Sequence, residues 1–222
     1  VHRGALGGDE KTGDGAGLLI QLPHSFFKKE AARLKIKLPQ PGDYGIGQFF
    51  LPLQKDRRQR LMALIKKAVT AEGGTILGWR DVSFNPGCLG EMAAESMPFM
   101  SQFFLTVQSP EGSALKGEDL ERRLYIIRKV IENQAASEGI STEDLYIPSL
   151  SSKTIVYKGL FVAGQLEKFY LDLADRELQS ALAVVHQRYS TNTFPSWPLA
   201  QPFRFLAHNG EINTLKGNVN KM

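Results

Sequence analysis

Two short groups of polar residues near the C-terminal end of the sequence could do chemistry together. Arg188 follows an apolar run at residues 182–185, and Asn209 with Gly210 follows a second apolar run at residues 203–207. An arginine fork binds a carboxylate through two parallel hydrogen bonds. An asparagine amide beside a glycine N–H can donate two hydrogen bonds to an oxyanion, and losing one of them raises the barrier by about 3 kcal/mol. The residues therefore predict a site for an amino acid attacked at a carbonyl carbon, such as glutamine.

Taken singly, these residues also have ordinary structural interpretations. Arg188 could be a buried ion-pair partner, and Asn209 with Gly210 is the commonest turn dipeptide. His186 and His208 could act as bases, or they could be hydrogen-bonded histidines at the ends of strands. It is the combination of these residues, and their order along the chain, that favours an active site.

The two polar groups can meet only if the apolar runs before them form neighbouring buried strands. The segment between them is rich in Thr, Asn and Ser and holds prolines at positions 195, 198 and 202. Proline fixes the backbone angle φ, so this segment is expected to be stiff. Phe194 and Trp197 are expected to pin it to the core. Functional groups at strand ends and on rigid loops are a common way to build a site.

Hydrophobic periodicity predicts the elements that must carry this site. Residues 55–72 and 117–135 are expected to form long amphipathic helices, because apolar residues recur on one face of each. Strands without regular alternation with helices indicate an α+β fold, and residues 1–222 are expected to belong to a single domain. Shorter helices are predicted at residues 25–34 and 164–170, and further strands at residues 18–22, 44–53, 75–82, 102–107, 145–150 and 154–157.

Composition argues against several kinds of partner. With 42% hydrophobic and 23% charged residues among 222, the sequence is typical of globular proteins. The net charge is +4, but Lys and Arg are dispersed and form no stripe with interleaved aromatic residues, so no nucleic acid partner is expected. No apolar run approaches the ~20 residues of a membrane span, so no membrane partner is expected either. The N-terminal residues show no signal-peptide pattern.

The single cysteine, Cys88, excludes an intramolecular disulfide and a multi-cysteine metal site, and no metal is expected. It also favours a reducing, cytoplasmic compartment. Cys88 lies in a predicted turn, where it could be a nucleophile paired with a distant histidine or a free structural thiol. A glycine-rich stretch at residues 7–17 lacks the Gly-Lys-Ser/Thr ending of a phosphate-binding loop and precedes a strand, which favours a tight turn.

The run HQRYSTNTFPSWPLAQPFRFLAHNGEINTLKGN, residues 186–218, resembles the class II glutamine amidotransferase domain of glutamate synthase large subunits. The opening block HRGALGGDEKTGDGAGLLIQLPH, residues 2–24, resembles a second part of that domain. The middle fits more loosely, through GWRDV at residues 78–82 and LGEMAAESMPF at residues 89–99. The resemblance covers essentially the whole chain, and the two end blocks are too long for a chance motif.

The resemblance implies a four-layer αββα sandwich of the N-terminal-nucleophile hydrolase type, incomplete because its first strand and C-terminal half are missing. Such enzymes use an N-terminal cysteine whose own α-amino group is the base. The thiolate attacks the side-chain amide of L-glutamine, ammonia leaves, and water hydrolyses the thioester. Because the sequence begins with Val1, the implied nucleophile is not in this chain. The chain alone is therefore expected to be inactive.

The resemblance also implies roles for individual residues. Arg188 would hold the substrate α-carboxylate, and Asn209 with Gly210 would form the oxyanion hole. Tyr189 and Thr191 would line the substrate pocket. Three further residues are expected to support the site from behind: Arg3, Asp14 and His208.

In the complete enzyme, the resemblance implies that the ammonia aminates 2-oxoglutarate at a synthase site. FMN and an iron–sulfur cluster are expected there, and no cofactor is expected in this chain. The expected partners are L-glutamine, the remainder of the large subunit and a small electron-donating subunit.

Three alternatives stay open. One is another class II amidotransferase, such as a phosphoribosylamine or glucosamine-phosphate synthase, although the TFPSWPLAQPF insertion at residues 193–203 looks like glutamate synthase. A second is a non-catalytic domain of the same fold that binds glutamine or a partner without cleaving anything. A third is a cysteine hydrolase centred on Cys88.

Overall fold

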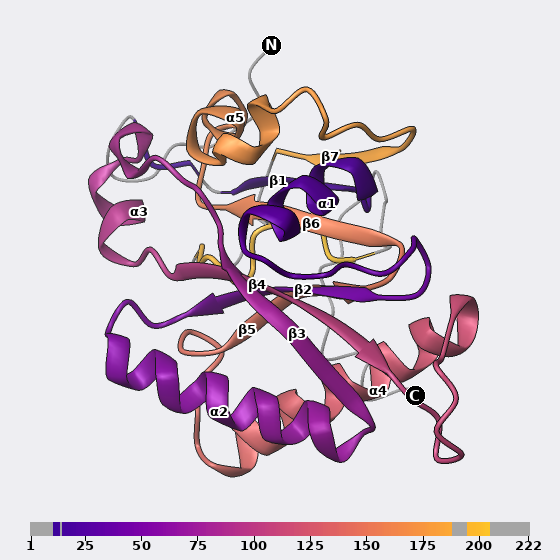
Figure 1. Ribbon diagram of the computed structural model, residues 1–222. Helices are drawn as coiled ribbons and strands as arrows, with labels where there is room; N and C mark the ends of the chain where they lie inside the picture. Colours follow the sequence, from indigo (N-terminus) through magenta and orange to yellow (C-terminus); the bar gives the residue numbers. More distant parts are fainter. Residues whose placement is uncertain (1–10, 14, 188–194, 205–222) are drawn as a thin grey trace, which may run out of the picture.

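Two antiparallel β-sheets lie one above the other at the centre of the molecule (Figure 1). The computed structural model describes residues 11–13, 15–187 and 195–204. The larger sheet has the strand order β3-β4-β2-β5, and the smaller sheet has the order β6-β1-β7. The strands are β1 (Ala16–Gln21), β2 (Gly45–Leu51), β3 (Gly74–Asp81), β4 (Phe99–Val107), β5 (Tyr146–Ser151), β6 (Thr154–Gly159) and β7 (Ala183–His186).

Two long helices, α2 (Lys55–Ala71) and α4 (Gly117–Ser137), cover the outer face of the larger sheet (Figure 1). Each turns its predicted apolar stripe toward the sheet, where side chains such as Phe49 and Phe103 complete one hydrophobic core. Both helix predictions are confirmed, and so is the choice of core over partner surface for the stripe of α4. The buried stripe residues are Leu61, Leu64, Ile65, Ala68 and Val69 of α2, and Leu120, Leu124, Ile127 and Ile131 of α4.

A second core, rich in aromatic side chains, lies on the inner face of the larger sheet. It is completed by the smaller sheet, by α1 (His24–Arg33) and by the short helix α5 (Leu166–Phe169). Its largest buried side chains include Phe26, Phe104, Tyr157, Phe161, Tyr170 and Trp197. Four short elements complete the described chain: η1 (Pro86–Cys88), α3 (Glu91–Glu95), η2 (Ala163–Gln165) and η3 (Leu171–Ala174).

A layer of polar side chains runs through this second core. Arg80 on β3 is 3% exposed, and its guanidinium donates to both carboxylate oxygens of Asp172 on η3, over 2.6 and 2.8 Å. It also donates to Glu30 on α1 and to Gln102 on β4. Asp172 accepts a further hydrogen bond from the hydroxyl of Tyr157 on β6. These bonds tie strands of both sheets to α1 and η3.

The charges of this layer support one another. Burial alone would lower the pKa of Arg80, but the hydrogen bonds and charge of Asp172, aided by Glu30, raise it above its ordinary value. Burial raises the pKa of Tyr157, and the negative charge of Asp172 raises it further, so Tyr157 remains a neutral donor. The ionised guanidinium is thus the stable form at this position.

The chain passes from the larger sheet to the smaller one through a tight corner between β5 and β6. Glu121 of α4 holds that corner, because its carboxylate accepts from the hydroxyl of Ser151 and from both the backbone N–H and the hydroxyl of Ser152, all over 2.7–2.8 Å. The helical layer is therefore bonded to the point where the two sheets join.

The α+β expectation is confirmed, while two details of the strand predictions are wrong. Residues 182–185 were expected to form a buried strand, but β7 is largely exposed, and Val185 is 67% exposed, because the described chain provides β7 with a neighbour only on its β1 side. Residues 203–207 were expected to form a second strand. Phe203 and Arg204 lie in a half-buried turn instead, with a positive φ at Arg204, and residues 205–207 lie outside the described residues.

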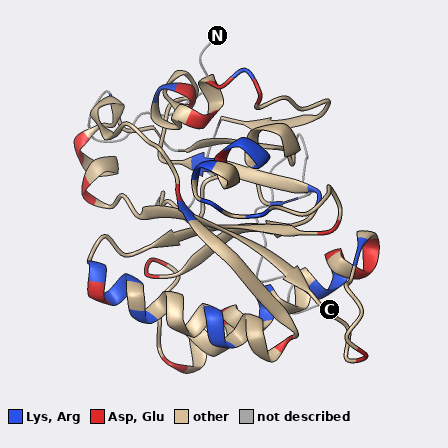
Figure 2. Ribbon diagram, in the orientation of Figure 1, with Lys and Arg blue, Asp and Glu red and all other residues tan. Residues whose placement is uncertain are grey.

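Charged residues of both signs occur in the helices and in the connecting loops (Figure 2). Helix α2 is predominantly basic, whereas α4 carries both signs. Some of the charges join elements, as Arg123 of α4 does with Glu72 at the end of α2 over 3.1 Å. None of the helices built from the described residues combines the length and the apolarity that crossing a membrane requires.

Two adjacent isoleucines of α4 give a matched test of the helix packing. Ile127 is fully buried and Ile126 is 42% exposed. Replacing Ile127 with Ala should lower the free energy of unfolding by about 2–5 kcal/mol, because it leaves a cavity under α4. Ile126→Ala should lower it by less than about 1 kcal/mol. Urea unfolding followed by circular dichroism measures both, and equal losses would contradict the orientation of α4.

Candidate active site

All the residues predicted to form or support the site lie outside the described residues. They are Arg3, Asp14, Arg188, Tyr189, Thr191, His208, Asn209 and Gly210. What the structure does describe is the set of segments that flank them: residues 11–13, Gly15 to β1, the strand β7, and residues 195–204. Their arrangement shows which parts of the sequence meet in space.

The pairing of β1 with β7 brings the two end blocks of the sequence together. The strands are antiparallel, with Gly17 opposite His186 and Ile20 opposite Ala183. The last residue of β7 therefore lies beside the first residues of β1, although about 170 positions separate them in the sequence. The glycine-rich block and the chain that leads toward Arg188 thus meet at one end of the smaller sheet.

Residues 195–204 pack against the same strand. A methyl group added at Gly17 would lie 2.6 Å from the carbonyl oxygen of Gln201 and 2.5 Å from Cβ of Lys158. One added at Gly15, whose φ is +135°, would lie 3.2 Å from Cβ of Ala200. Glycine is needed at position 17 because the backbone of residue 201 approaches so closely. The described glycines of this block therefore serve as a packing surface for the segment 195–204, and the expected tight turn stays a prediction because residues 7–10 and 14 lie outside the described residues.

Trp197 anchors this segment, as expected. It is 1% exposed, and its indole Nε1 donates to the carbonyl oxygen of Ala93 over 3.1 Å. Its ring meets Phe161 edge to face at 5.3 Å between ring centres and also contacts Phe50 and Phe169. Phe194, the other expected anchor, lies outside the described residues.

Two polar tethers near the site were not expected from the sequence. Gln165 donates through Nε2 to the carbonyl oxygens of Lys11 and Cys88, over 2.9 and 2.6 Å, which holds the glycine-rich block against η1. At the other end of β7, the hydroxyl of Ser180 accepts from the backbone N–H of Gln21, and the side chain of Gln21 accepts from the N–H of Ala181. Single polar residues in short loops carry no periodicity that would mark them.

A third tether, Lys158 on β6, has a signal in the sequence that was overlooked. It is a charged residue inside the apolar strand TIVYKG, and it is 1% exposed. A lysine within a buried strand needs a specific polar partner, because burying its amine without one costs free energy.

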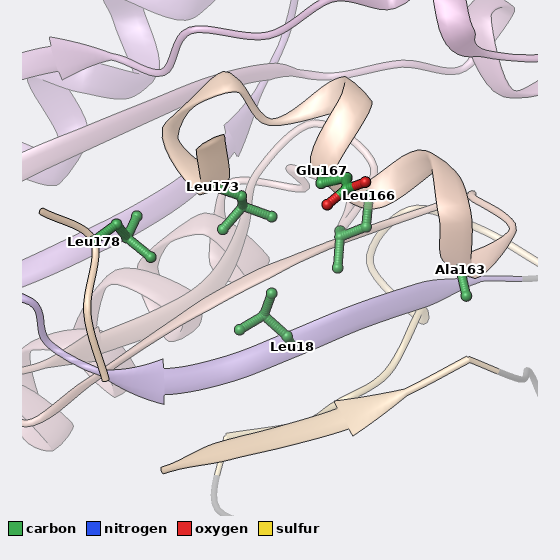
Figure 3. A pocket seen from close by; sticks show the side chains of 6 residues that line it. All are labelled: Leu18, Ala163, Leu166, Glu167, Leu173 and Leu178. Carbon is green, nitrogen blue, oxygen red and sulfur yellow. The ribbon is translucent and has the colours of Figure 1, made fainter. Parts of the chain in front are cut away.

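The cavities of the described chain are poor candidates for an amino-acid site. A groove between β1 and the segment that carries α5 has a volume of about 330 Å³, and Figure 3 shows the side chains that line it. Its walls offer one carboxylate and no cation that could hold a substrate carboxylate. A second hollow, of about 530 Å³, includes His24 and Lys153 in its lining. The predicted site residues lie outside the described residues, so none of them is among these described linings. The groove of Figure 3 is lined by Leu18, Ala163, Leu166, Glu167, Leu173 and Leu178.

Cys88 has the environment of a structural thiol. It is half-buried, its Sγ lies 3.3 Å from the carbonyl oxygen of Asn85, and burial raises its pKa. A raised pKa disfavours the thiolate, which is the nucleophilic form. His186 is half-buried at the end of β7. Over the residues that the structure describes, no three His, Cys, Asp or Glu side chains gather as a metal site would need.

Comparison with known proteins identifies the family of this chain. The sequence matches the family "Glutamine amidotransferases class-II" over residues 1–222. This chain belongs to the class II glutamine amidotransferases. The resemblance seen in the two end blocks is confirmed, and with it the α+β fold class.

Three relatives of this amidotransferase chain are named glutamate synthases. It is 48% identical over 221 residues to the protein named "Glutamate synthase [NADPH] large chain" of Bacillus subtilis (strain 168), and 46% identical over 222 residues to the protein of that name from Azospirillum brasilense. It is 43% identical to "Ferredoxin-dependent glutamate synthase, chloroplastic" of Oryza sativa subsp. japonica. Each match covers 100% of this chain but only 13–14% of the relative, so the chain spans about one seventh of their length.

Gly159 offers a test of the packing that carries the segment 195–204. A methyl group there would lie 2.3 Å from the ring of Trp197 and 2.6 Å from that of Phe161. Gly159→Ala should therefore lower the free energy of unfolding by about 1–3 kcal/mol through overpacking. Gly164→Ala is the matched control, because a methyl group at Gly164 meets nothing within 4 Å. Urea unfolding curves for the two variants compare them, and an unchanged Gly159→Ala protein would refute the close packing of Trp197.

Proposed function

We propose that this chain is the glutamine-hydrolysing part of a glutamate synthase large chain, and that residues 1–222 are part of a single class II glutamine amidotransferase domain. The observation that carries the proposal is the identity of 43–48% with proteins named glutamate synthase over the whole of this chain. The pairing of β1 with β7 supports it, because it brings together the two sequence blocks that the reaction needs.

In this proposal, L-glutamine is held at both ends, by its α-carboxylate and by its side-chain amide. Arg188 binds the α-carboxylate through its two-pronged guanidinium. The side-chain amide of Asn209 and the N–H of Gly210 donate to the oxygen of the amide under attack, where negative charge develops. Tyr189 and Thr191 line the pocket between them, and Arg3, Asp14 and His208 support these groups.

The nucleophile comes from outside this sequence. Cys88 is the only cysteine here, and its raised pKa and its bond to Asn85 do not suit attack. We propose that the complete protein supplies an N-terminal cysteine, whose own α-amino group accepts the thiol proton. An α-amine with a pKa of about 7.7–8.0 can do so near neutral pH.

The rest of the reaction belongs to the rest of the protein. An iron–sulfur cluster needs three or four cysteine ligands, and the single Cys88 cannot provide them. We therefore place the cluster, FMN and the amination of 2-oxoglutarate in the remainder of the large subunit, with a small subunit that donates electrons. The proposed compartment is the cytoplasm, with neither nucleic acid nor membrane as a partner.

The alternatives make different predictions. Another class II amidotransferase would pass its ammonia to an acceptor other than 2-oxoglutarate. A non-catalytic domain would bind glutamine in the complete protein without releasing ammonia. Hydrolysis of glutamine itself yields glutamate, so two separate assays distinguish these from the proposal: release of ammonia from glutamine, and conversion of 2-oxoglutarate to glutamate with added ammonia.

Arg188→Ala, made in the complete protein, should raise the KM for glutamine by about a hundredfold, because it removes a charge-assisted, two-pronged contact to the substrate. Asn209→Ala should instead lower kcat by about 10²–10³-fold, because its contact strengthens only as the oxyanion forms. Steady-state kinetics with glutamine measure both effects. Glutamate formation from added ammonia should stay unchanged in both variants, and a wild-type KM in Arg188→Ala would refute the assigned role.

The chain of residues 1–222 alone should release no ammonia from glutamine, because it lacks the proposed nucleophile. A coupled ammonia assay tests this, with the complete protein as the positive control. Ammonia release by the isolated chain that Arg188→Ala abolishes would show that the nucleophile lies within residues 1–222.

A further inference from the structure

Lys158 makes a set of contacts that a lysine of the protein core rarely has. Its Nζ donates to the carbonyl oxygen of Pro198 over 2.7 Å and to the hydroxyl of Tyr146 over 3.0 Å. The same Nζ lies 4.6 Å from the ring centre of Tyr146 and 4.5 Å from that of Phe203. Two aromatic faces and two neutral oxygens thus surround the amine.

This arrangement is unfavourable as simple core packing. Burial lowers the pKa of Lys158 well below its ordinary value, and the positive charge of Arg204 lowers it further. No carboxylate forms an ion pair with Lys158 among the residues that the structure describes. An apolar side chain of similar length would fill the same space without this cost. An apolar side chain could not replace the hydrogen bond to the Pro198 carbonyl or the contact of the amine with the Phe203 ring.

Those contacts fix the segment 195–204 to both sheets at residues 198 and 203. Lys158 itself belongs to β6 of the smaller sheet, and Tyr146 belongs to β5 of the larger one. The ends of the segment are held by other groups, Trp197 in the aromatic core and Arg204 on Glu132 of α4 over 3.3 Å. Between these ends, Lys158 holds both the Pro198 carbonyl and the Phe203 ring.

We propose that Lys158 is a positioning residue for glutamine binding, acting through the segment 195–204. The inference rests on the proposed function, since this segment joins the block that contains Arg188 to the block that contains Asn209 and Gly210. By holding this connection at residues 198 and 203, Lys158 restricts the relative positions that the two blocks can take when they bind one glutamine molecule. It touches neither the substrate nor the reacting atoms.

The test is kinetic and uses the complete protein. Lys158→Met keeps the length and apolar stem of the side chain but frees the Pro198 carbonyl and the Phe203 ring. It should raise the KM for glutamine about tenfold, the effect of losing one hydrogen bond to a charged donor, with kcat within about twofold of wild type. Glutamate formation from added ammonia should be unchanged.

Two further variants separate positioning from stability. Tyr146→Phe removes the hydrogen bond of Lys158 on the sheet side but keeps the aromatic ring and the contacts of Lys158 with the segment, so its KM should stay near the wild-type value. Phe203→Leu removes the aromatic ring that Lys158 contacts on the segment side. It should therefore also raise the KM for glutamine. Because Phe203 is only half-buried, this variant keeps the inference testable if Lys158→Met does not fold.

The outcomes distinguish this inference from the function on which it rests. A wild-type KM in both Lys158→Met and Phe203→Leu, or equal losses of the glutamine-dependent and ammonia-dependent rates, would overturn the role of Lys158 alone. Two results would overturn the proposed function and this inference together. The first is that the wild-type complete protein releases no ammonia from glutamine, and the second is that Arg188→Ala leaves this release unchanged.

Discussion

The salt bridge between Arg80 and Asp172 is the interaction on which the arrangement of the two sheets depends. Both side chains are almost fully buried, and around them lie Glu30, Gln102 and Tyr157, which come from a helix and from a strand of each sheet. A buried charge left without its partner costs about 3–5 kcal/mol, so these elements are bound to one another by the need to keep the guanidinium compensated. Apolar packing alone would tolerate small shifts between the sheets, whereas a two-pronged salt bridge does not.

The site region is held by backbone approach and single polar tethers. Gly17 lets the backbone of Gln201 lie directly on β1, and Trp197 fixes the start of the same segment among aromatic rings. Gln165 binds the other side of the glycine-rich block. The larger sheet and its two long helices form a scaffold, while the parts that lead toward the proposed substrate contacts are attached to the smaller sheet by such individual contacts.

The sequence predicted the scaffold better than the surroundings of the site. Helices α2 and α4 have long apolar stripes, and the strands of the larger sheet are apolar runs between turn residues, so local periodicity was sufficient for both. The charge of Lys158 within an apolar strand is a signal in the sequence, but its partner Pro198 lies too far along the chain to be predicted. Gln165 carries no such signal, and its partner Lys11 is equally distant. The exposure of β7 was mispredicted because an apolar strand says nothing of how many neighbours it has. The roles of Arg188 and Asn209 came from resemblance and stay predictions.

The way β7 is fixed has a consequence for its alignment with β1. A strand with apolar residues on one face only cannot slip by one position, since the slip would turn that face to water. Val184 and Val185 present valine to both faces, so the side-chain pattern does not choose between the two registers. The register is instead fixed by two hydrogen bonds at the far end of the strand, which join Gln21 to Ser180 and to Ala181. A one-residue slip would move the residues of β7 by about 3.4 Å along β1 and turn each side chain to the other face. A serine hydroxyl six positions before His186 therefore places this histidine opposite Gly17.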